Sequence, residues 1–261
     1  MEQLHFRFMT NLDFDSEVKD HHFALKCIPQ SNARQRVENC RVEIIPDAEV
    51  FYGTDAHGNK TISGSILTPH DSFEFIVDGT VTTGIDIFEA FEPDEVKNAY
   101  YKYPTPYTTA GPKLAEYFDS LGLTKDMSTY DKVTAVMRAV NRDFTYEKNV
   151  TDINTTAEEA MALRKGVCQD FTHVMIALCR MADIPARYAV GIMKGEGESH
   201  AWVEAWCRGY WYGFDPTNNW LVDANYIKIS ARRDYSDCIV NRGKFIGNAA
   251  QSKTVTAMVL D

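Results

Sequence analysis

Hydrophobic and polar residues alternate along much of the first ninety residues. Leu4, Phe6 and Phe8 are separated by single residues, and the same period of two recurs over 23–27 and 73–77. This period is typical of strands that bury one face. Turn-forming residues over 54–59 predict a hairpin loop between two such strands. We therefore expect residues 1–90 to form an N-terminal β-sandwich domain, and we find no group of catalytic residues in it.

From residues 91–94 onward the pattern changes from strand-like to helical. A helix over 131–140 is predicted by apolar residues at helical spacing, namely Val133, Val136, Met137 and Val140. A shorter helix is expected over 156–163, with Thr155 or Thr156 as its cap. Since a chain of 261 residues is long enough for two domains, we expect residues 91–261 to form a second, catalytic domain.

Cys168 stands at the predicted start of a further helix. The apolar residues that follow it recur at three and four positions and fit one buried face: Phe171, Val174, Met175, Leu178 and Cys179. Unpaired backbone N–H groups at a helix start stabilise an anion, so this location favours the thiolate form of Cys168. The backbone N–H of Cys168 is also the natural first donor to an oxyanion. Cys179 lies within the apolar pattern and is expected to be an inert core residue.

Residues 194–199 are rich in glycine and predict a short loop. After it, residues 200–207 and 210–215 predict a β-hairpin that turns at Arg208-Gly209. With a two-residue turn, position 207 faces 210 and position 202 faces 215. His200 and Asp215 then become diagonal neighbours on one face, with β-carbons roughly 7–8 Å apart, within reach of a hydrogen bond between the two side chains. A four-residue loop keeps this register, whereas a three-residue loop needs a bulge.

Together these residues offer the parts of a catalytic triad. Cys168 supplies a nucleophilic thiol, His200 can take and return its proton, and Asp215 can orient the imidazole. Each residue also has an ordinary structural explanation: a packed cysteine, a core histidine, and a turn aspartate before proline. The coincidence of all three at suitable positions favours the triad.

Charge and composition limit the classes of partner that the protein is expected to bind. The formal net charge is −10, which argues against nucleic acid and against an anionic membrane surface. No stretch approaches the roughly 20 apolar residues of a membrane span. The first residues lack a basic segment followed by an apolar run, so the expected location is the cytoplasm.

The six cysteines are dispersed and include no CxxC pair, which argues against a disulfide scaffold. Neither His21-His22 nor the group of Cys168, His173 and Cys179 has the usual spacing of zinc ligands. We therefore expect no metal and no cofactor.

Three motifs, over 166–171, 200–204 and 214–218, resemble those of the transglutaminase-like superfamily and occur in its order of Cys, His and Asp. Residues 180–188 resemble the segment that follows its nucleophile. Residues 232–237 and the β-rich first ninety resemble parts of bacterial members described as cysteine proteases.

The resemblance implies an α+β, papain-like core, in which a helix bearing the cysteine packs on an antiparallel sheet bearing His and Asp. It implies that Cys168 is the nucleophile, His200 the base and acid, and Asp215 the orienting carboxylate.

The sequence departs from related proteins at two places. The loop from Gly191 to His200 is shorter than in many relatives. Papain-like proteases carry a glutamine six residues before the cysteine, where this chain has Ala162. Tyr146 is a candidate for the missing second oxyanion donor, although an aromatic at such a place more often only packs.

Three functions remain open. The first is thiol-dependent hydrolysis of a peptide or protein amide. The second is acyl transfer to an amine, which shares the first half-reaction. The third is a non-catalytic binding protein with a vestigial site, against which the intact triad argues. We favour hydrolysis, because water is always present and transfer needs a second binding site. The sequence predicts no oligomeric state.

Overall fold

The structure is a computed structural model that describes residues 1–56, 58–85, 89–90 and 99–261. The predicted change of pattern at 91–94 lies outside the described residues, and so does position 57 of the predicted hairpin loop. The division of the chain at residue 90 therefore stays a prediction.

A long first strand, β1, belongs to two β-layers. Its first half pairs with β5 and β16, and its second half pairs with β4 and β15. The pairing with β5 shifts between Asp13 and Val18, where the strand passes from one layer to the other. The strands of the two layers are β1 (Glu2–Leu25), β2 (Gln35–Ile45), β3 (Val50–Thr54), β4 (Lys60–Ile66), β5 (His70–Thr83), β10 (Gly195–Gly197), β15 (Asn241–Ile246) and β16 (Gln251–Leu260).

The predicted alternation in β1 is confirmed, since Leu4, Phe6 and Phe8 are buried between exposed neighbours. The two layers pack through these alternate side chains. The rings of Phe23 and Phe73, one from each layer, have centroids 4.9 Å apart. Burial of such apolar area is the main stabilising contribution to a sandwich of this kind.

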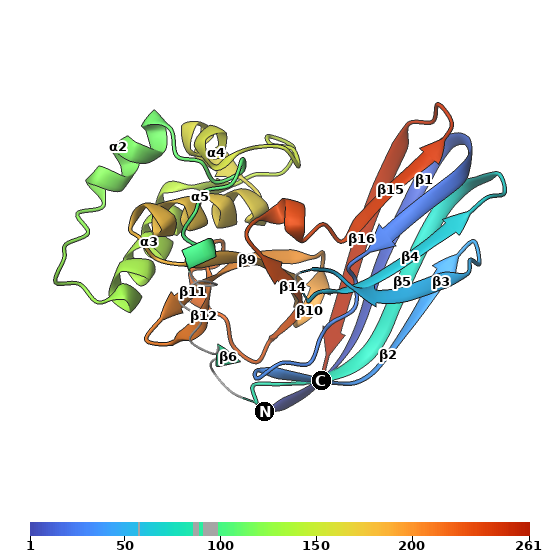
Figure 1. Cartoon of the computed structure of the whole chain (residues 1–261), viewed down its shortest axis with the longest axis horizontal. Coiled ribbons are helices and arrows are strands. Elements are labelled where there is room, and N and C mark those ends of the chain that lie inside the picture. The colour runs from blue at the N-terminus through green and yellow to red at the C-terminus, as the bar shows by residue number, and fades with distance from the viewer. Residues whose placement is uncertain (57, 86–88, 91–98) are drawn as a thin grey trace.

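Strands from the far end of the chain complete this β-region (Figure 1). β15 and β16 pair with β1, and β10 pairs with β16 at Ala257–Val259. The sequence predicted a loop over 194–199, which is wrong for Gly195–Gly197. The physical reason is that this short strand is stabilised by a partner sixty residues later, which no local pattern reveals.

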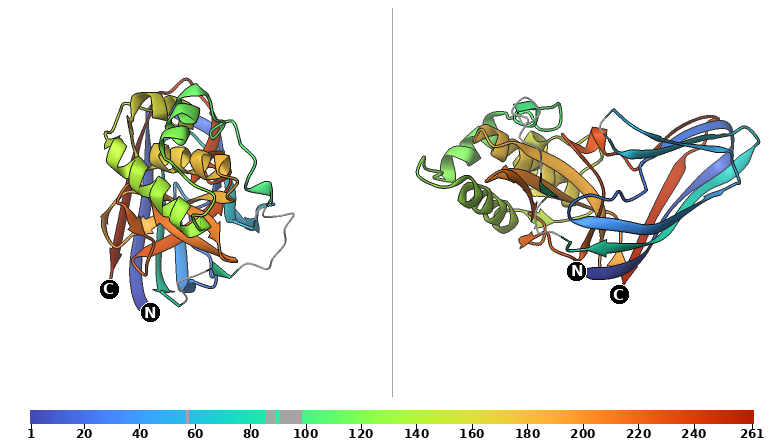
Figure 2. Two further views of the ribbon diagram at one scale, coloured as in Figure 1. Left: turned by 90° about the vertical axis from the view of Figure 1, so that its left-hand side faces the viewer. Right: turned by 60° about the horizontal axis from the view of Figure 1, so that its bottom comes forward.

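The second sheet is antiparallel, with the strand order β13-β12-β11-β9-β14 and β6 beside β12. Its strands are β6 (Glu89–Ala90), β9 (Ala186–Met193), β11 (His200–Cys207), β12 (Tyr210–Asp215), β13 (Trp220–Leu221) and β14 (Tyr226–Arg232). Helices lie on one side of this sheet and the β-layers lie on the other (Figures 1 and 2). This arrangement confirms the α+β class.

The helices are α2 (Pro112–Ser120), α3 (Thr129–Asp143), α4 (Ala157–Leu163) and α5 (Cys168–Met181), with a short 3-10 helix, η1 (Tyr235–Asp237). A two-stranded parallel pair, β7 (Thr145–Tyr146) and β8 (Lys165–Gly166), lies before α5. The cap of α4 is Thr156. We expected α5 to bury one face, but its residues 170–180 are all buried, because α2, α3, α4 and the sheet surround it. Among the described residues, no helix is long and apolar enough to cross a membrane.

Partly buried hydrogen bonds join the β-layers to the second sheet. The Gln35 side chain donates to Lys228 O at 2.7 Å and accepts from Lys228 N at 2.8 Å, so it pairs with β14 as a strand would. Arg34 donates to Val222 O at 2.8 Å, and Thr83 donates to Ala224 O at 2.6 Å. These contacts fix residues 222–228 against the β-layers.

Candidate active site

Cys168 is the first residue of α5, as the sequence predicted. The helix start is held by Asp170, whose Oδ2 accepts from Val167 N at 2.7 Å and from Thr151 Oγ1 at 2.8 Å. A β-carbon on Gly166 would collide with this carboxylate, which explains why glycine precedes the helix. Asp170 therefore caps the start of α5 and also joins it to the loop at Thr151.

The β11–β12 hairpin has the predicted register. Cys207 pairs with Tyr210 and Val203 pairs with Phe214, around the two-residue turn Arg208-Gly209. Both turn residues have positive φ, at 52° and 88°, as the tight turns favoured in hairpins require. The expected contact follows: Nε2 of His200 lies 2.8 Å from Oδ2 of Asp215.

Asp215 is fully buried and is surrounded by donors. Oδ2 also accepts from Asn218 Nδ2 and from the Tyr226 hydroxyl, each at 2.8 Å. Oδ1 accepts from the backbone N–H of Thr217 at 2.9 Å and of Asn218 at 3.2 Å. Burial opposes the charged form, but the hydrogen bond and charge of His200, with the bonds from Asn218 and Tyr226, outweigh it and hold the pKa of Asp215 below its ordinary value. The group is therefore a carboxylate at neutral pH.

His200 interacts with both of the other residues. Burial disfavours the imidazolium, yet hydrogen bonds with Asp215 and Cys168 overcome burial and raise the pKa of His200 to about 10. Because Nε2 is engaged by Asp215, Nδ1 is the nitrogen left to exchange a proton with the sulfur of Cys168. The structure thus brings the three predicted residues together, while their catalytic roles remain predictions.

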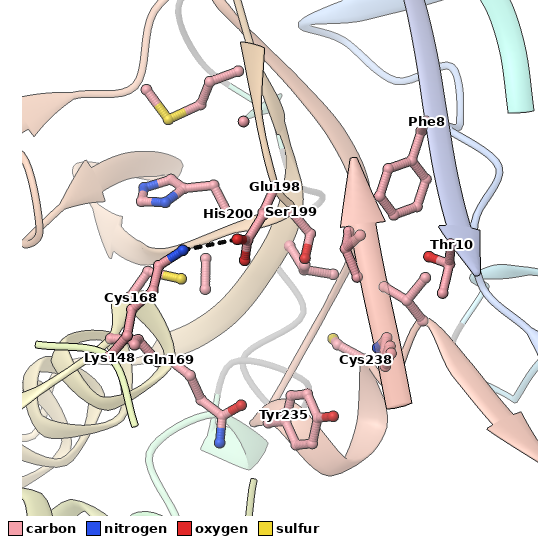
Figure 3. A pocket seen from close by; sticks show the side chains of 18 of the residues that line it. Phe8, Thr10, Lys148, Cys168, Gln169, Glu198, Ser199, His200, Tyr235 and Cys238 are labelled. Carbon is pink, nitrogen blue, oxygen red and sulfur yellow. Dashed lines mark hydrogen bonds and ion pairs between the residues drawn. The ribbon is translucent and has the colours of Figure 1, made fainter. Parts of the chain in front are cut away.

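A pocket of about 880 Å³ opens in front of Cys168 and His200. Figure 3 shows Phe8 and Thr10 of β1 on the side away from Cys168. Lys148 and Glu198 form an ion pair of 2.8 Å between the loop after β7 and the loop before β11. The β-layers therefore supply one wall of the pocket.

Tyr146 also lines this pocket, in β7 beside Gly166. Its side chain is half exposed, and its ring lies 6.5 Å from that of Phe171. Burial and the neighbouring Cys168 raise the pKa of Tyr146, so its hydroxyl keeps its proton and can donate. The backbone N–H of Cys168 lies in the first turn of α5, where helix geometry provides no intrahelical acceptor. Both oxyanion assignments stay predictions.

Sequence reasoning missed several residues of this site. Asn218 belongs to the 214–218 motif but was given no role, and Tyr226 lies eleven residues beyond Asp215, where its alternating strand was the only signal. The structure also explains residues near the site: Glu204 is a buried partner of Arg187 and Lys228. Within the described ranges, no group of three His, Cys, Asp or Glu residues could hold a metal ion.

Comparison with known proteins agrees with this geometry. Residues 119–216 match the family model of the transglutaminase-like superfamily, and residues 4–82 match that of the bacterial transglutaminase-like N-terminal region. An uncharacterized protein of Mycobacterium leprae is 27% identical over 255 residues, which cover 88% of each chain. One of Mycobacterium tuberculosis is 28% identical over 270 residues, which cover 86% of this chain and 81% of its own.

The crystal structure of a candidate cysteine protease of Cytophaga hutchinsonii is similar in fold. It superimposes with a TM-score of 0.81 at 22% identity, covering all of this chain and 92% of that chain. At this identity the likeness concerns the fold alone, which extends over both sheets and the helices.

Proposed function

Because this chain belongs to the transglutaminase-like superfamily, we propose that it is a thiol-dependent amide hydrolase acting on peptides or proteins. The observation that carries the proposal is the position of His200, which contacts the buried carboxylate of Asp215 on one side and Cys168 on the other, at the end of an open pocket. In this proposal Cys168 is the nucleophile, His200 the acid and base, and Asp215 the residue that orients the imidazole.

The first half-reaction forms a thioester. The Cys168 thiolate attacks the carbonyl carbon, and the carbonyl oxygen becomes an oxyanion next to the backbone N–H of Cys168 and, as a second donor, Tyr146. The C–N bond then breaks while His200 gives a proton to the departing amine. The imidazolium that this requires is favoured by Asp215, which raises the pKa of His200.

The second half-reaction releases the acyl group. The now neutral His200 takes a proton from water as the water oxygen attacks the thioester carbonyl. The C–S bond breaks, which gives a carboxylic acid and restores the thiolate–imidazolium pair. An amine in place of water would give acyl transfer through the same steps, so the acceptor has to be found by experiment.

To test the proposal, the protein is incubated with a peptide library, with and without a labelled primary amine, and the products are analysed by mass spectrometry. We expect cleavage or deamidation that Cys168→Ala abolishes. Incorporation of the amine that depends on Cys168 would show that the reaction is acyl transfer and not hydrolysis. If Cys168→Ala and the unsubstituted protein gave the same products, neither chemistry would hold and the site would be vestigial.

A further inference from the structure

β16 has one edge that is only partly paired. Along one side it pairs with β1 over its whole length, from Gln251 to Leu260. On the other side its partner among the described residues is β10, which covers Ala257–Val259 alone. Residues 251–256 therefore present an open strand edge.

The backbone groups on this edge can be identified from the register. Asp15 N donates to Ala250 O at 3.1 Å, in line with the β1–β16 pairing, which is continuous and without a bulge. In an antiparallel pair the bonds to one neighbour come from alternate residues. Even-numbered residues of β16 thus bond to β1, and the N–H and C=O groups of Lys253 and Val255 point to the open side. On this same open side, β10 pairs with Ala257, Met258 and Val259.

The open edge borders the candidate active site. Residues Lys253, Thr254 and Val255 line the same pocket as Cys168 and His200. The chain leaves β10 at Gly197 and reaches His200 three residues later, a path of roughly 10 Å in extended conformation. A strand that continued the line of β10 along β16 would therefore run past the imidazole.

A buried polar group lies at the same place. Thr10 is the register partner of Val255 on β1, and it lines the pocket. Its hydroxyl oxygen is buried and has no hydrogen-bond partner within the described protein. Figure 3 shows Thr10 on the side of the pocket away from Cys168.

We propose that an extended segment of a polypeptide substrate pairs as an added β-strand with the edge formed by Lys253 and Val255. This inference rests on the proposed function and names its substrate class: a peptide backbone with free N–H groups in extended conformation. The chain itself shows that the edge accepts such a strand, because β10 already occupies the neighbouring pairing positions. Main-chain bonds of this kind give affinity with little dependence on sequence.

The proposal is tested with Cys168→Ala protein, so that binding is measured without turnover. The probe is a chymotryptic digest of reduced casein, and the measurement is amide hydrogen exchange of β16 resolved to single residues. Before the digest is added, Lys253 and Val255 should exchange faster than Thr254 and Thr256. With the digest, exchange at Lys253 and Val255 should slow by about fivefold or more, which corresponds to one backbone hydrogen bond.

Substitutions give a second readout. Val255→Pro removes the N–H on the open side and should weaken binding of the digest about fivefold. Val255→Ala keeps that N–H and should retain binding. Gln251→Pro removes an N–H on the same edge at the first position of the strand, away from the pocket, and should also retain binding. If Val255→Pro does not fold, the exchange experiment still decides.

Unchanged exchange at Lys253 and Val255 would overturn the proposal, as would equal losses from Val255→Pro and Gln251→Pro. So would a self-associated protein in which these two amides are already protected, since a second copy would then cover the edge. Protection by the digest without any cleavage by the unsubstituted protein would leave this proposal standing and refute hydrolysis. Cleavage by the unsubstituted protein without protection of Lys253 and Val255 would refute this proposal and leave hydrolysis standing.

Discussion

The Tyr226 hydroxyl donates to Oδ2 of Asp215 at 2.8 Å, the same oxygen that accepts from Nε2 of His200 at 2.8 Å. Tyr226 is buried, and its ring packs edge-on against Trp202 with the ring centroids 5.4 Å apart. It is the first residue of β14, the strand that is hydrogen-bonded to Gln35 of the β-layers. The orientation of the carboxylate therefore depends on a residue held by contacts outside the β11–β12 hairpin.

Tyr226→Phe should lower kcat/KM about fivefold to tenfold, because one buried hydrogen bond of about 1–1.5 kcal/mol is lost from Asp215. Without this donor the pKa of Asp215 rises, so the acid limb of the pH–rate profile should move to higher pH. The profile is measured with the peptide identified in the library experiment. The control is Tyr130→Phe, which removes the hydroxyl from a ring that packs on Phe214 away from the pocket. An unmoved acid limb in Tyr226→Phe would show that the hydroxyl does not act through Asp215.

Cys168 should be alkylated by iodoacetamide near neutral pH well before Cys179. The imidazolium of His200 lies next to the Cys168 sulfur and favours the reactive thiolate. Burial raises the pKa of the Cys179 thiol and hides it from the reagent. Labelling is followed at each cysteine by peptide mass spectrometry. His200→Ala should slow labelling of Cys168 about tenfold or more, since the neighbouring positive charge is lost. Equal and slow labelling of all six cysteines would refute the catalytic assignment.

Asp170→Ala should reduce both the stability and the reactivity of Cys168. The carboxylate caps α5 and bonds Thr151, so its loss should cost about 1–2 kcal/mol of unfolding free energy, measured by urea denaturation. The start of α5 would also loosen, which should slow alkylation of Cys168. Thr156→Ala removes the comparable cap of α4 and should cost about 1 kcal/mol with no effect on alkylation. Equal effects of the two variants on alkylation would contradict a local role for Asp170.

Acid should destabilise the β-layers through His21. Burial and the neighbouring His70 lower the pKa of His21 from 6.5 to about 4. Between these values the unfolded chain binds a proton that the folded chain does not, so unfolding free energy falls as pH is lowered through this window. The loss attributable to this residue is up to about 3 kcal/mol.

The measurement for His21 is urea denaturation from pH 7 to pH 4. His21→Gln should reduce the pH dependence strongly, while His22→Gln, which removes the smallest of the three causes that lower this pKa, should reduce it less. Part of the dependence should persist in both variants, because burial also lowers the pKa of His173 to about 4. If the unfolding free energy of His21→Gln fell with pH as steeply as that of the unsubstituted protein, this explanation would be wrong.

Local patterns could predict the parts of the site that local geometry determines. A two-residue turn sets the register of β11 and β12, so the approach of His200 to Asp215 followed from the spacing alone. The start of α5 at Cys168 followed from the apolar periodicity and a preceding glycine. In both cases the deciding interactions lie within about fifteen residues.

The missed features depend on pairing between distant segments. Tyr226 reaches Asp215 because β14 pairs with β9, and the pocket wall at Thr10 and Lys253 exists because β16 pairs with β1. β10 was predicted to be a loop since three residues containing two glycines carry no strand signal of their own. Local patterns in a single sequence do not predict contacts between such distant segments.

The pairing of β1 with β16 has a consequence for the order in which the protein matures. Residues 2–25 are synthesised long before β16, one of the two strands that pair with their first half, which follows more than two hundred residues later. Contacts of such long sequence separation form slowly. The pocket wall that faces the thiol is complete only when this last strand is added. A chain still in synthesis thus carries Cys168 before this wall of the pocket exists.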